Sequence, residues 1–346
     1  MVLFSLQFRN APEKILKVKI FISGATGYIG SRLAIRLAEE GNIVHALYRT
    51  KSKTSNIEHP NILFFKGDIL DPESLSIALS GCEQVYHTAA FAKVWDPDPS
   101  RIYRLNIEGS MNVIKCGIAA GIKKFVCTST AGVFGPSGET GIINESSPKP
   151  GKYFIDYESS KAILEEILKT IVISGVNIVI VNPTRVYGPG LLSESNGVTR
   201  MIKSYLEGRW RIIPGNGKSI GNYVYVEDVV TGHILAMKKG LPGENYILGG
   251  SSATYNEFFA ELADLCGKKY RMFQISLPLM LLISYGLLFY AKITGKEPLI
   301  TPPLVKRFVH QWNVSSSLAV KQLGYNPLDL NQGLKKTLAW LNDKNP

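Results

Sequence analysis

Apolar runs and helical patterns alternate along the first half of the chain. The run VKIFIS at 18–23 is mostly apolar, as a strand buried on both faces would be, and 31–41 then repeats apolar residues at helical spacing up to a closing glycine. Further strands are expected at 42–49, 61–68, 84–90, 123–130 and 177–190, and further helices at 71–81, 102–121 and 157–175. Strands and helices that alternate in this way form a parallel sheet with right-handed crossovers. The pattern therefore predicts an α/β protein with a doubly wound parallel sheet.

Three glycines follow the first strand, in the segment GATGYIG. In a doubly wound sheet the ligand binds beyond the carboxyl ends of the strands, and this is the first such turn. Gly24 permits a tight turn, Gly27 lets the backbone approach a pyrophosphate, and Gly30 lets the helix lie close to the strand. Glycine triplets also occur in turns that are merely tight. Here the strand before and the helix after favour dinucleotide binding.

The end of the second strand indicates which dinucleotide is bound. NAD is usually held there by an acidic residue on the ribose, but this chain has YRTKSK, with Arg49, Lys51 and Lys53. A guanidinium suits the 2′-phosphate of NADP(H), so Arg49 favours that cofactor, although these cations could also be solvated loop residues and NAD stays possible. Asp68, after the third strand, could accept from the adenine amino group or cap the next helix.

The segment YESSK contains two residues that suit proton transfer. Tyr157 and Lys161 are four positions apart on an expected helix, so they share one face. A free phenol has a pKa near ~10, which is too high for efficient proton exchange at neutral pH. One ammonium about 4 Å away can supply the roughly 4 kcal/mol that lowers this pKa by about three units. We therefore expect Lys161 to lower the pKa of Tyr157.

Composition and residue spacing argue against a nucleic-acid-binding protein and against a metal site. The 346 residues are 45% hydrophobic, enough for a large core, and the net charge of +11 is spread along the chain without a nucleic-acid-binding motif. We expect no nucleic-acid partner, because phosphates of a small ligand or lipid headgroups suit this charge better. The histidines show no metal-ligand spacing, so no metal is expected. The widely spaced cysteines predict a reducing, cytoplasmic location; they are Cys82, Cys116, Cys127 and Cys266.

One long apolar segment, 272–291, carries no charge and is followed by basic residues. A bilayer span needs about 20 mainly apolar residues, but Pro278, Gly286 and several polar residues interrupt this segment, which argues against a span. The favoured interpretation is a helix that covers the substrate pocket or packs in the core. Shallow contact with a membrane surface is the alternative, and it would make the protein membrane-associated.

Over about residues 17–342 the chain resembles the extended short-chain dehydrogenase/reductase superfamily, also called the NAD-dependent epimerase/dehydratase family. The resemblance rests on motifs in that family's order: GATGYIG, GDILD, HTAA, NIEGS, TSTAGVFG, YESSK, NPTRVYGPG and YVEDVV. The chain looks most like dihydroflavonol-reductase-like, 3β-hydroxysteroid-dehydrogenase-like and hopanoid-associated epimerase-like members. This resemblance implies a nucleotide-binding Rossmann fold with a smaller C-terminal substrate lobe, and a homodimer in many relatives.

The resemblance also implies roles for particular residues. Thr130 would be the catalytic hydroxyl, with Ser129 as the fallback, and Lys161 would hold the nicotinamide ribose. Asn106 would support Lys161, unless it is a helix residue with local bonds only. The cofactor-binding residues would be Gly24, Thr26, Gly27, Tyr28, Ile29, Gly30, Arg49, Lys53, Asp68, Ile69, Thr88, Ala89, Ala90, Thr128, Tyr157, Lys161, Pro183 and Thr184. The candidates for substrate contact are Phe91, Arg185 and Tyr187, and Arg185 suits a structural ion pair equally well.

The domain boundaries follow from these motifs. The nucleotide-binding domain is expected at 17–187, with 222–240 returning to it as a strand and a helix. The substrate-binding lobe is then formed by 188–221 and 241–346, and 1–16 is a loose N-terminal extension.

The expected function is that of an NADP(H)-dependent oxidoreductase. It would interconvert a ketone and a secondary alcohol on a fairly apolar small molecule. The alternative is a nucleotide-sugar epimerase or dehydratase with tightly bound NAD(P). Gly221 argues against that alternative, because the resemblance places there an arginine that clamps the substrate diphosphate. A non-catalytic NADP-responsive protein is a third interpretation, but a sensor has no need of a tuned phenol.

Overall fold

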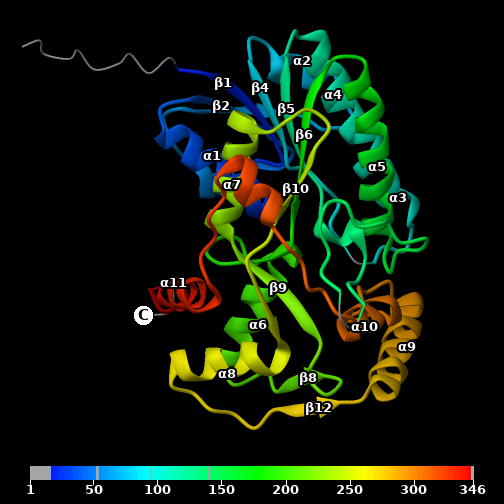
Figure 1. Cartoon of the computed structure of the whole chain (residues 1–346). Coiled ribbons are helices and arrows are strands. Elements are labelled where there is room, and N and C mark those ends of the chain that lie inside the picture. The colour runs from blue at the N-terminus through cyan, green and yellow to red at the C-terminus, as the bar shows by residue number, and fades with distance from the viewer. Residues whose placement is uncertain (1–16, 52–53, 94, 139–140, 344–346) are drawn as a thin grey trace, which may run out of the picture.

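The computed structural model describes residues 17–343 apart from 52–53, 94 and 139–140. The expected extension at 1–16, and Lys53 among the expected cofactor-binding residues, lie outside the described residues. Figure 1 shows a central sheet flanked by helices and, below it, a smaller lobe that ends on one side in α9.

Seven strands form the central sheet, and all neighbouring strands are parallel. They are β1 (Lys19–Ser23), β2 (Ile43–Tyr48), β3 (Ile62–Lys66), β4 (Gln84–His87), β5 (Lys124–Thr128), β6 (Asn177–Pro183) and β10 (Asn245–Leu248). The order β10-β6-β5-β4-β1-β2-β3 reverses direction between β1 and β4, and such a reversal opens a crevice for a ligand at the carboxyl ends of the strands. The predicted doubly wound α/β fold is confirmed.

Helices cover both faces of this sheet (Figure 1). The helices and turns of this part are α1 (Tyr28–Glu39), η2 (Ser55–Ile57), α2 (Pro72–Leu79), α3 (Ser100–Tyr103), η3 (Arg104–Glu108), α4 (Gly109–Ala119), η4 (Ala131–Phe134), α5 (Asp156–Ile173) and α7 (Val226–Lys239). α1 and α7 share one apolar core with the sheet, while α2, α4 and α5 share the other. In α1 this packing follows from Leu33 and Leu37, which are one turn apart and both buried.

The smaller lobe contains two short sheets, in the orders β11-β9-β7 and β12-β8. Its elements are β7 (Arg185–Tyr187), η5 (Glu194–Asn196), α6 (Gly197–Leu206), β8 (Ile212–Pro214), β9 (Ile220–Tyr225), β11 (Ser251–Thr254), α8 (Tyr255–Cys266), β12 (Phe273–Ile275), α9 (Leu277–Thr294), α10 (Pro302–Val309) and α11 (Leu330–Asp343). Its core is rich in buried aromatic side chains such as Tyr205, Tyr223 and Phe258. The lobe therefore has an apolar core of its own.

Two segments of the expected lobe, both within 241–346, pack with the nucleotide-binding domain instead. β10 pairs with β6 at the edge of the central sheet. The π-helical turn η6 (Ala319–Leu323) contributes Ala319 and Leu323 to the core that α1 and α7 share. The four residues of β10, three of them apolar, are too few to indicate which sheet they join, so the sequence did not place β10 correctly.

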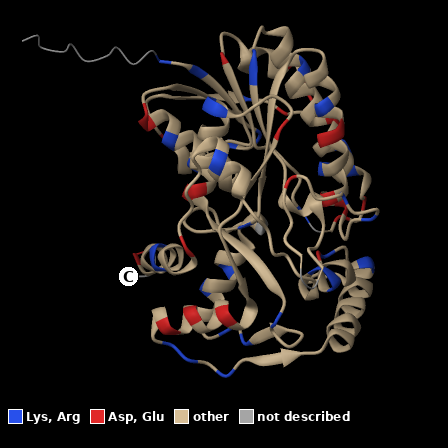
Figure 2. Cartoon of the chain, viewed as in Figure 1, with Lys and Arg blue, Asp and Glu red and all other residues tan. Residues whose placement is uncertain are grey.

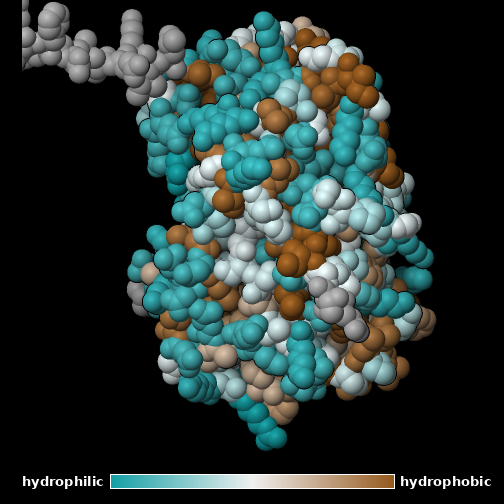
Figure 3. All heavy atoms as spheres, in the orientation of Figure 1, coloured by the Kyte–Doolittle hydropathy of each residue, from teal (hydrophilic) through white to brown (hydrophobic). Residues whose placement is uncertain are grey.

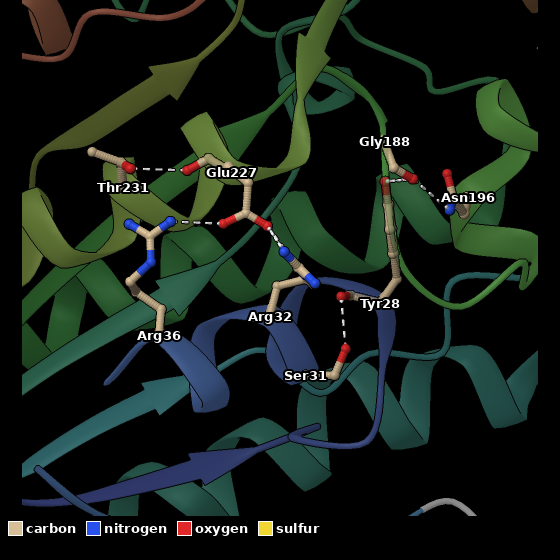
Figure 4. A network of polar contacts seen from close by, with 8 residues as sticks. All are labelled: Tyr28, Ser31, Arg32, Arg36, Gly188, Asn196, Glu227 and Thr231. Atoms are coloured by element: carbon tan, nitrogen blue, oxygen red, sulfur yellow. Dashed lines mark hydrogen bonds and ion pairs between the residues drawn. The ribbon is translucent and has the colours of Figure 1, made fainter. Parts of the chain in front are cut away.

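Glu227 joins the returning helix α7 to α1 (Figure 4). Its Oε1 accepts a hydrogen bond from Arg32 Nε at 2.6 Å, and its Oε2 accepts one from Arg36 Nη2 at 2.9 Å. Arg32 and Arg36 are one turn apart on α1, so a single carboxylate holds both. This pairing fixes α7 on the face of the sheet where the glycine turn begins α1.

α9 lies at the edge of the lobe with most of its surface exposed. By length and composition it is the one helix in the described part of the chain that could cross a membrane, yet only 17% of it is buried in the protein. Figure 2 shows α9 almost without charged residues, and in Figure 3 apolar side chains gather over it at the lower right. Core packing, part of the favoured interpretation of 272–291, is therefore wrong.

Candidate active site

The glycine turn between β1 and α1 is packed too closely for side chains. Gly24 has a φ of +76°, a left-handed conformation that favours glycine, and a Cβ there would fall 2.6 Å from the backbone nitrogen of Ala89. A Cβ on Gly30 would fall 2.2 Å from the carbonyl oxygen of Gly24. Gly27 begins α1 without a side-chain cap. The first amides of α1 therefore have no side-chain acceptor, and such amides bind phosphate oxygens.

The other residues expected around the dinucleotide lie near the carboxyl ends of neighbouring strands. Thr88 Oγ1 donates to the carbonyl oxygen of Ser23 at 2.8 Å, which ties the end of β4 to the end of β1. The buried Tyr28 hydroxyl donates to the carbonyl oxygen of Gly188 at 3.1 Å (Figure 4). The same edge of the sheet also contains Thr26, Ile29, Ile69, Ala89, Ala90, Thr128, Pro183 and Thr184.

Arg49 stands at the end of β2, beside Asp68 after β3. Arg49 Nη1 lies 3.8 Å from Asp68 Oδ2, and about two-thirds of the Arg49 side chain is exposed, at 65%. The other Asp68 oxygen, Oδ1, accepts from the backbone amide of Leu70 at 3.0 Å. Asp68 thus stabilises the turn after β3, and Arg49 presents an accessible guanidinium at the end of β2.

Lys161 is fully buried on α5, and its ammonium nitrogen has no hydrogen-bond partner among the described residues. Burial lowers the pKa of Lys161 to about 8. An unpaired buried ammonium is costly, so this position is suited to a ligand that supplies acceptors. A ribose carries such hydroxyl oxygens, and the residues at this site therefore fit a nicotinamide dinucleotide.

Tyr157 lies one turn before Lys161 on α5. Burial, and then the neighbouring Glu158 carboxylate, raise the pKa of Tyr157 to about 12, while the charge of Arg307 opposes this. The expectation that Lys161 lowers this pKa is wrong for the structure, because burial and Glu158 dominate. Glu158 is itself buried, and its Oε1 accepts from Arg307 Nε at 2.7 Å.

Two hydroxyls compete for the third catalytic position. Thr130 begins the turn η4, and its Oγ1 accepts from the amide of Gly132 at 3.2 Å, which leaves its hydroxyl hydrogen free to donate to another group. Ser129 Oγ is buried and has no partner among the described residues. Thr130 lines a pocket and Ser129 does not. The preference for Thr130 stays a prediction.

Asn106 sits in the π-helical turn η3 between α3 and α4, a local irregularity that is frequent at functional sites. Its Oδ1 accepts from the amide of Phe91 at 2.7 Å, and its Nδ2 donates to Ser160 Oγ at 2.9 Å. Ser160 Oγ in turn donates to the carbonyl oxygen of Tyr157 at 2.8 Å. Asn106 therefore bridges the loop after β4 to α5, the helix that contains Tyr157 and Lys161.

A pocket lies between the end of the central sheet and the lobe. It is lined by Thr130, Ala131, Gly132, Pro183, Thr184, Arg185, Asn222, Arg307, Trp312 and Val314. The structure thus brings Thr130 together with two expected cofactor contacts and with Arg185. Sequence reasoning missed Arg307 and Trp312, which come from α10 and the segment after it. The only local signal in the sequence was for Arg307, a basic residue that follows the apolar segment 272–291.

The other two substrate candidates lie elsewhere. Tyr187 is buried in the core of the lobe, where its ring meets that of Tyr225 and its hydroxyl points to the carbonyl oxygen of Leu330 at 3.5 Å. Its expected contact with substrate is therefore wrong for this structure. Phe91 lies after β4, with the guanidinium of Arg101 5.7 Å from its ring centre, and it does not line the pocket.

The glycine turn and the Tyr157–Lys161 helix stand at the crevice of a doubly wound sheet, and together they define an NAD(P)-dependent oxidoreductase. The chain belongs to the NAD dependent epimerase/dehydratase family, whose profile matches residues 20–249. This confirms the family that the sequence motifs indicate.

Individual relatives cover nearly the whole chain. A protein of Synechocystis sp. named "Putative dihydroflavonol 4-reductase" is 29% identical over 92% of this chain and 93% of its own length. "Sterol demethylase protein B" of Methylococcus capsulatus is 29% identical over 93% and 98%. Among solved structures, UDP-glucose 4-epimerase of Thermotoga maritima with UDP-glucose has a TM-score of 0.79 at 26% identity, over 95% of this chain and 100% of that one.

Proposed function

We propose that the protein is an NADP(H)-dependent oxidoreductase that interconverts a ketone and a secondary alcohol on a largely apolar small molecule. The observation that carries this proposal is Lys161, a buried ammonium that has no partner among the described residues and lies one helical turn from Tyr157. A residue arrangement of this kind has no structural purpose of its own, since an apolar side chain would pack there without the cost of burying a charge.

Each residue has a separate role in the proposed reaction. The nicotinamide, when bound, supplies or accepts the hydride. With a pKa of about 12, the Tyr157 phenol is protonated at neutral pH and starts as the proton donor to a carbonyl oxygen. The free hydroxyl hydrogen of Thr130 orients that oxygen. Lys161 holds the cofactor ribose through its buried ammonium.

The preference for NADP(H) rests on Arg49. Its guanidinium is mostly exposed and is only loosely paired with Asp68, at 3.8 Å, so it can approach a 2′-phosphate. Lys51, two residues after Arg49, is a second exposed cation in the same loop.

The apolar substrate is supported by the pocket lining and by the names of relatives. The pocket lining includes the apolar residues Trp312, Val314, Pro183 and Ala131. Relatives at 29% identity carry names of a dihydroflavonol reductase and of a sterol demethylase protein, and the second name refers to a largely apolar ring system. A cytoplasmic location is part of the proposal, since the four cysteines are all free.

Product analysis with a panel of ketones tests the proposal. Purified protein with NADPH should convert an apolar cyclic ketone to its alcohol with equal loss of NADPH absorbance, and Tyr157→Phe should not. The nucleotide-sugar alternative is favoured by the similarity to a UDP-glucose 4-epimerase. Epimer exchange in UDP-glucose without net NADPH loss would establish that alternative and exclude the proposed reductase.

A further inference from the structure

Arg185 is a partly buried residue whose guanidinium is enclosed by protein, and no anion pairs with it among the described residues. Its Nη1 donates to the Tyr255 hydroxyl at 3.1 Å and to the Tyr223 hydroxyl at 3.3 Å, and the guanidinium carbon lies within 5.5 Å of both ring centres. Its Nη2 is buried and has no hydrogen-bond partner among the described residues. Within the described part of the chain, no carboxylate forms an ion pair with Arg185.

The groups around Arg185 do not neutralise its charge. Burial raises the pKa of the Tyr223 phenol to about 12, so this hydroxyl is neutral and offers only a lone pair. Aromatic rings stabilise a guanidinium by roughly 0.5 to 2 kcal/mol each, which is less than the several kcal/mol that a buried unpaired ion costs. The arrangement is therefore incomplete without an oxyanion at Nη2.

The position of Arg185 places that oxyanion at the substrate site. Arg185 lines the same pocket as Thr130 and Thr184. The second guanidinium of this pocket, on Arg307, is already paired with Glu158 at 2.7 Å. Arg185 is thus the cation of this pocket whose charge is uncompensated.

We propose that Arg185 binds a carboxylate of the substrate, which makes the preferred substrate a hydroxy acid or oxo acid with an apolar remainder. This inference rests on the proposed function, because it assigns a subsite of the same pocket. One guanidinium with one free nitrogen suits a single carboxylate, whereas a diphosphate needs several donors. The carboxylate would lie beside the secondary alcohol or ketone that Thr130 orients.

A carboxylic acid and its methyl ester test whether Arg185 binds a carboxylate. We would titrate the Tyr157→Phe protein, loaded with NADP⁺, with 3-hydroxydecanoic acid and with its methyl ester, so that binding needs no turnover. The acid should bind at least tenfold more tightly than the ester. In Arg185→Gln the ratio of the two affinities should fall about tenfold to a hundredfold, as expected for one charge-assisted hydrogen bond. Arg185→Lys should recover part of the ratio.

Controls separate a local effect from a global one. Arg200→Gln removes an exposed guanidinium from α6 and should leave the acid-to-ester ratio unchanged. A wild-type protein that binds the acid no better than the ester, or tight binding of UDP that depends on Arg185, would overturn the carboxylate assignment. If the acid binds as expected but no ketone or alcohol is turned over, the proposed function fails while this subsite stands.

A second, independent observation concerns α9. Met280, Ser284 and Ala291 are buried against the protein, and the opposite face exposes Leu282 (70%), Phe289 (67%) and Ile293 (69%). These three are spaced at 282, 289 and 293, so they lie along one stripe of the helix. Further exposed apolar residues of the same segment are Leu279, Ile283, Tyr285 and Tyr290.

Charge and position indicate what covers this stripe. Lys292 and Lys296 are exposed at the end of α9, and Lys306 is exposed on the neighbouring α10. Apolar and aromatic side chains flanked by lysines are typical of a helix that lies in the interface of an anionic membrane. α10 also contributes Arg307 to the substrate pocket, so the stripe is one helix away from that site.

We infer that α9 docks the protein on an anionic lipid surface, with the Leu282–Phe289–Ile293 stripe inserted. The wild-type protein should float with vesicles of phosphatidylglycerol and phosphatidylcholine, and float less with phosphatidylcholine alone or at high salt. Changing the three stripe residues to Ser should reduce flotation about tenfold or more. The matched control changes Ile77, Ile173 and Leu241, which are also exposed, to Ser and should float like the wild type.

Two outcomes would overturn the docking proposal. One is equal flotation of the stripe variant and the control variant. The other is a wild-type dimer in light scattering that the stripe variant converts to a monomer, since α9 would then bind a second copy of the chain.

Discussion

The guanidinium of Arg185 occupies the space beside Gly221. A Cβ built on Gly221 would fall 2.5 Å from Arg185 Nη1 and 2.9 Å from the Tyr223 hydroxyl, so no residue with a side chain fits at 221 without displacing Arg185. The position at which nucleotide-sugar relatives are expected to have an arginine is therefore glycine for a structural reason. The guanidinium comes from β7, and it is held by Tyr223 and Tyr255.

Gly221→Ala should impair substrate binding more than stability. The added methyl pushes on the end of a flexible arginine side chain, so the overpacking cost stays within about 1 to 3 kcal/mol of unfolding free energy. We expect the KM for the ketone substrate to rise about tenfold, with the dissociation constant for NADPH unchanged. Gly197→Ala is the control, because a Cβ there meets nothing within 4 Å. Equal KM values for the two variants would contradict the prediction.

UDP and UDP-glucose should bind poorly to the NADP-loaded protein. Arg185 offers one free nitrogen and Arg307 is engaged by Glu158, so a buried diphosphate would lack roughly 2 kcal/mol or more of charge-assisted bonding. Calorimetric titration should give dissociation constants near millimolar for both compounds. Micromolar binding of UDP would instead favour the epimerase alternative.

The fold could be predicted because buried parallel strands are nearly continuous apolar runs. The run at 18–23 contains β1, and the periodic segment after it contains α1. The prediction from this pattern failed where an apolar segment does not show which part of the protein it packs against. The sequence NYIL of β10 is equally suited to the central sheet and to a strand of the lobe. The helix α9 has the same composition whether its apolar face is covered or exposed.

The site could be predicted only where its chemistry is local in sequence. Gly24, Gly30, Tyr157 and Lys161 stand in short motifs with fixed spacing. The pKa of Tyr157 depends first on how completely the phenol is buried, then on the neighbouring Glu158 and on Arg307, which is far away in the sequence. The motif YESSK contains Glu158, but it does not encode the burial of the phenol or the position of Arg307, so the direction of that pKa shift could not be predicted.

Arg49→Ala should weaken NADPH binding about tenfold to a hundredfold and leave NADH nearly unchanged. The lost contact is a charge-assisted bidentate pair with the 2′-phosphate, worth roughly 1.5 to 3 kcal/mol. Fluorescence titration with both cofactors measures the effect. Lys66→Ala, which removes an exposed cation at the end of β3, is the control for general charge. An equal loss for NADPH and NADH would rule out the assigned role of Arg49.

NADPH binding should take up a proton near pH 9. Lys161 has a pKa of about 8 in the structure, so it is mostly neutral at pH 9 and fully protonated at pH 6. Ribose oxygens favour the ammonium and raise this pKa, so uptake should approach one proton at pH 9 and be absent at pH 6. Calorimetry in buffers of different ionisation enthalpy measures it, in Tyr157→Phe protein to remove the phenol. Uptake that persists in Lys161→Met would contradict the assignment.

Tyr157→Phe should abolish turnover while NADPH affinity stays near that of the wild type. The phenol acts on the substrate oxygen, and general acid catalysis is worth roughly a hundredfold or more, whereas the dinucleotide is held by the glycine turn and Lys161. Lys161→Met should lower both turnover and NADPH affinity, because the buried ammonium has no partner among the described residues and is free to hold the cofactor. Single-turnover rates with saturating NADPH separate the two effects. If Tyr157→Phe kept more than about a tenth of the rate, the proton would have to come from another group, and the free hydroxyl of Thr130 would be the first to examine by Thr130→Val.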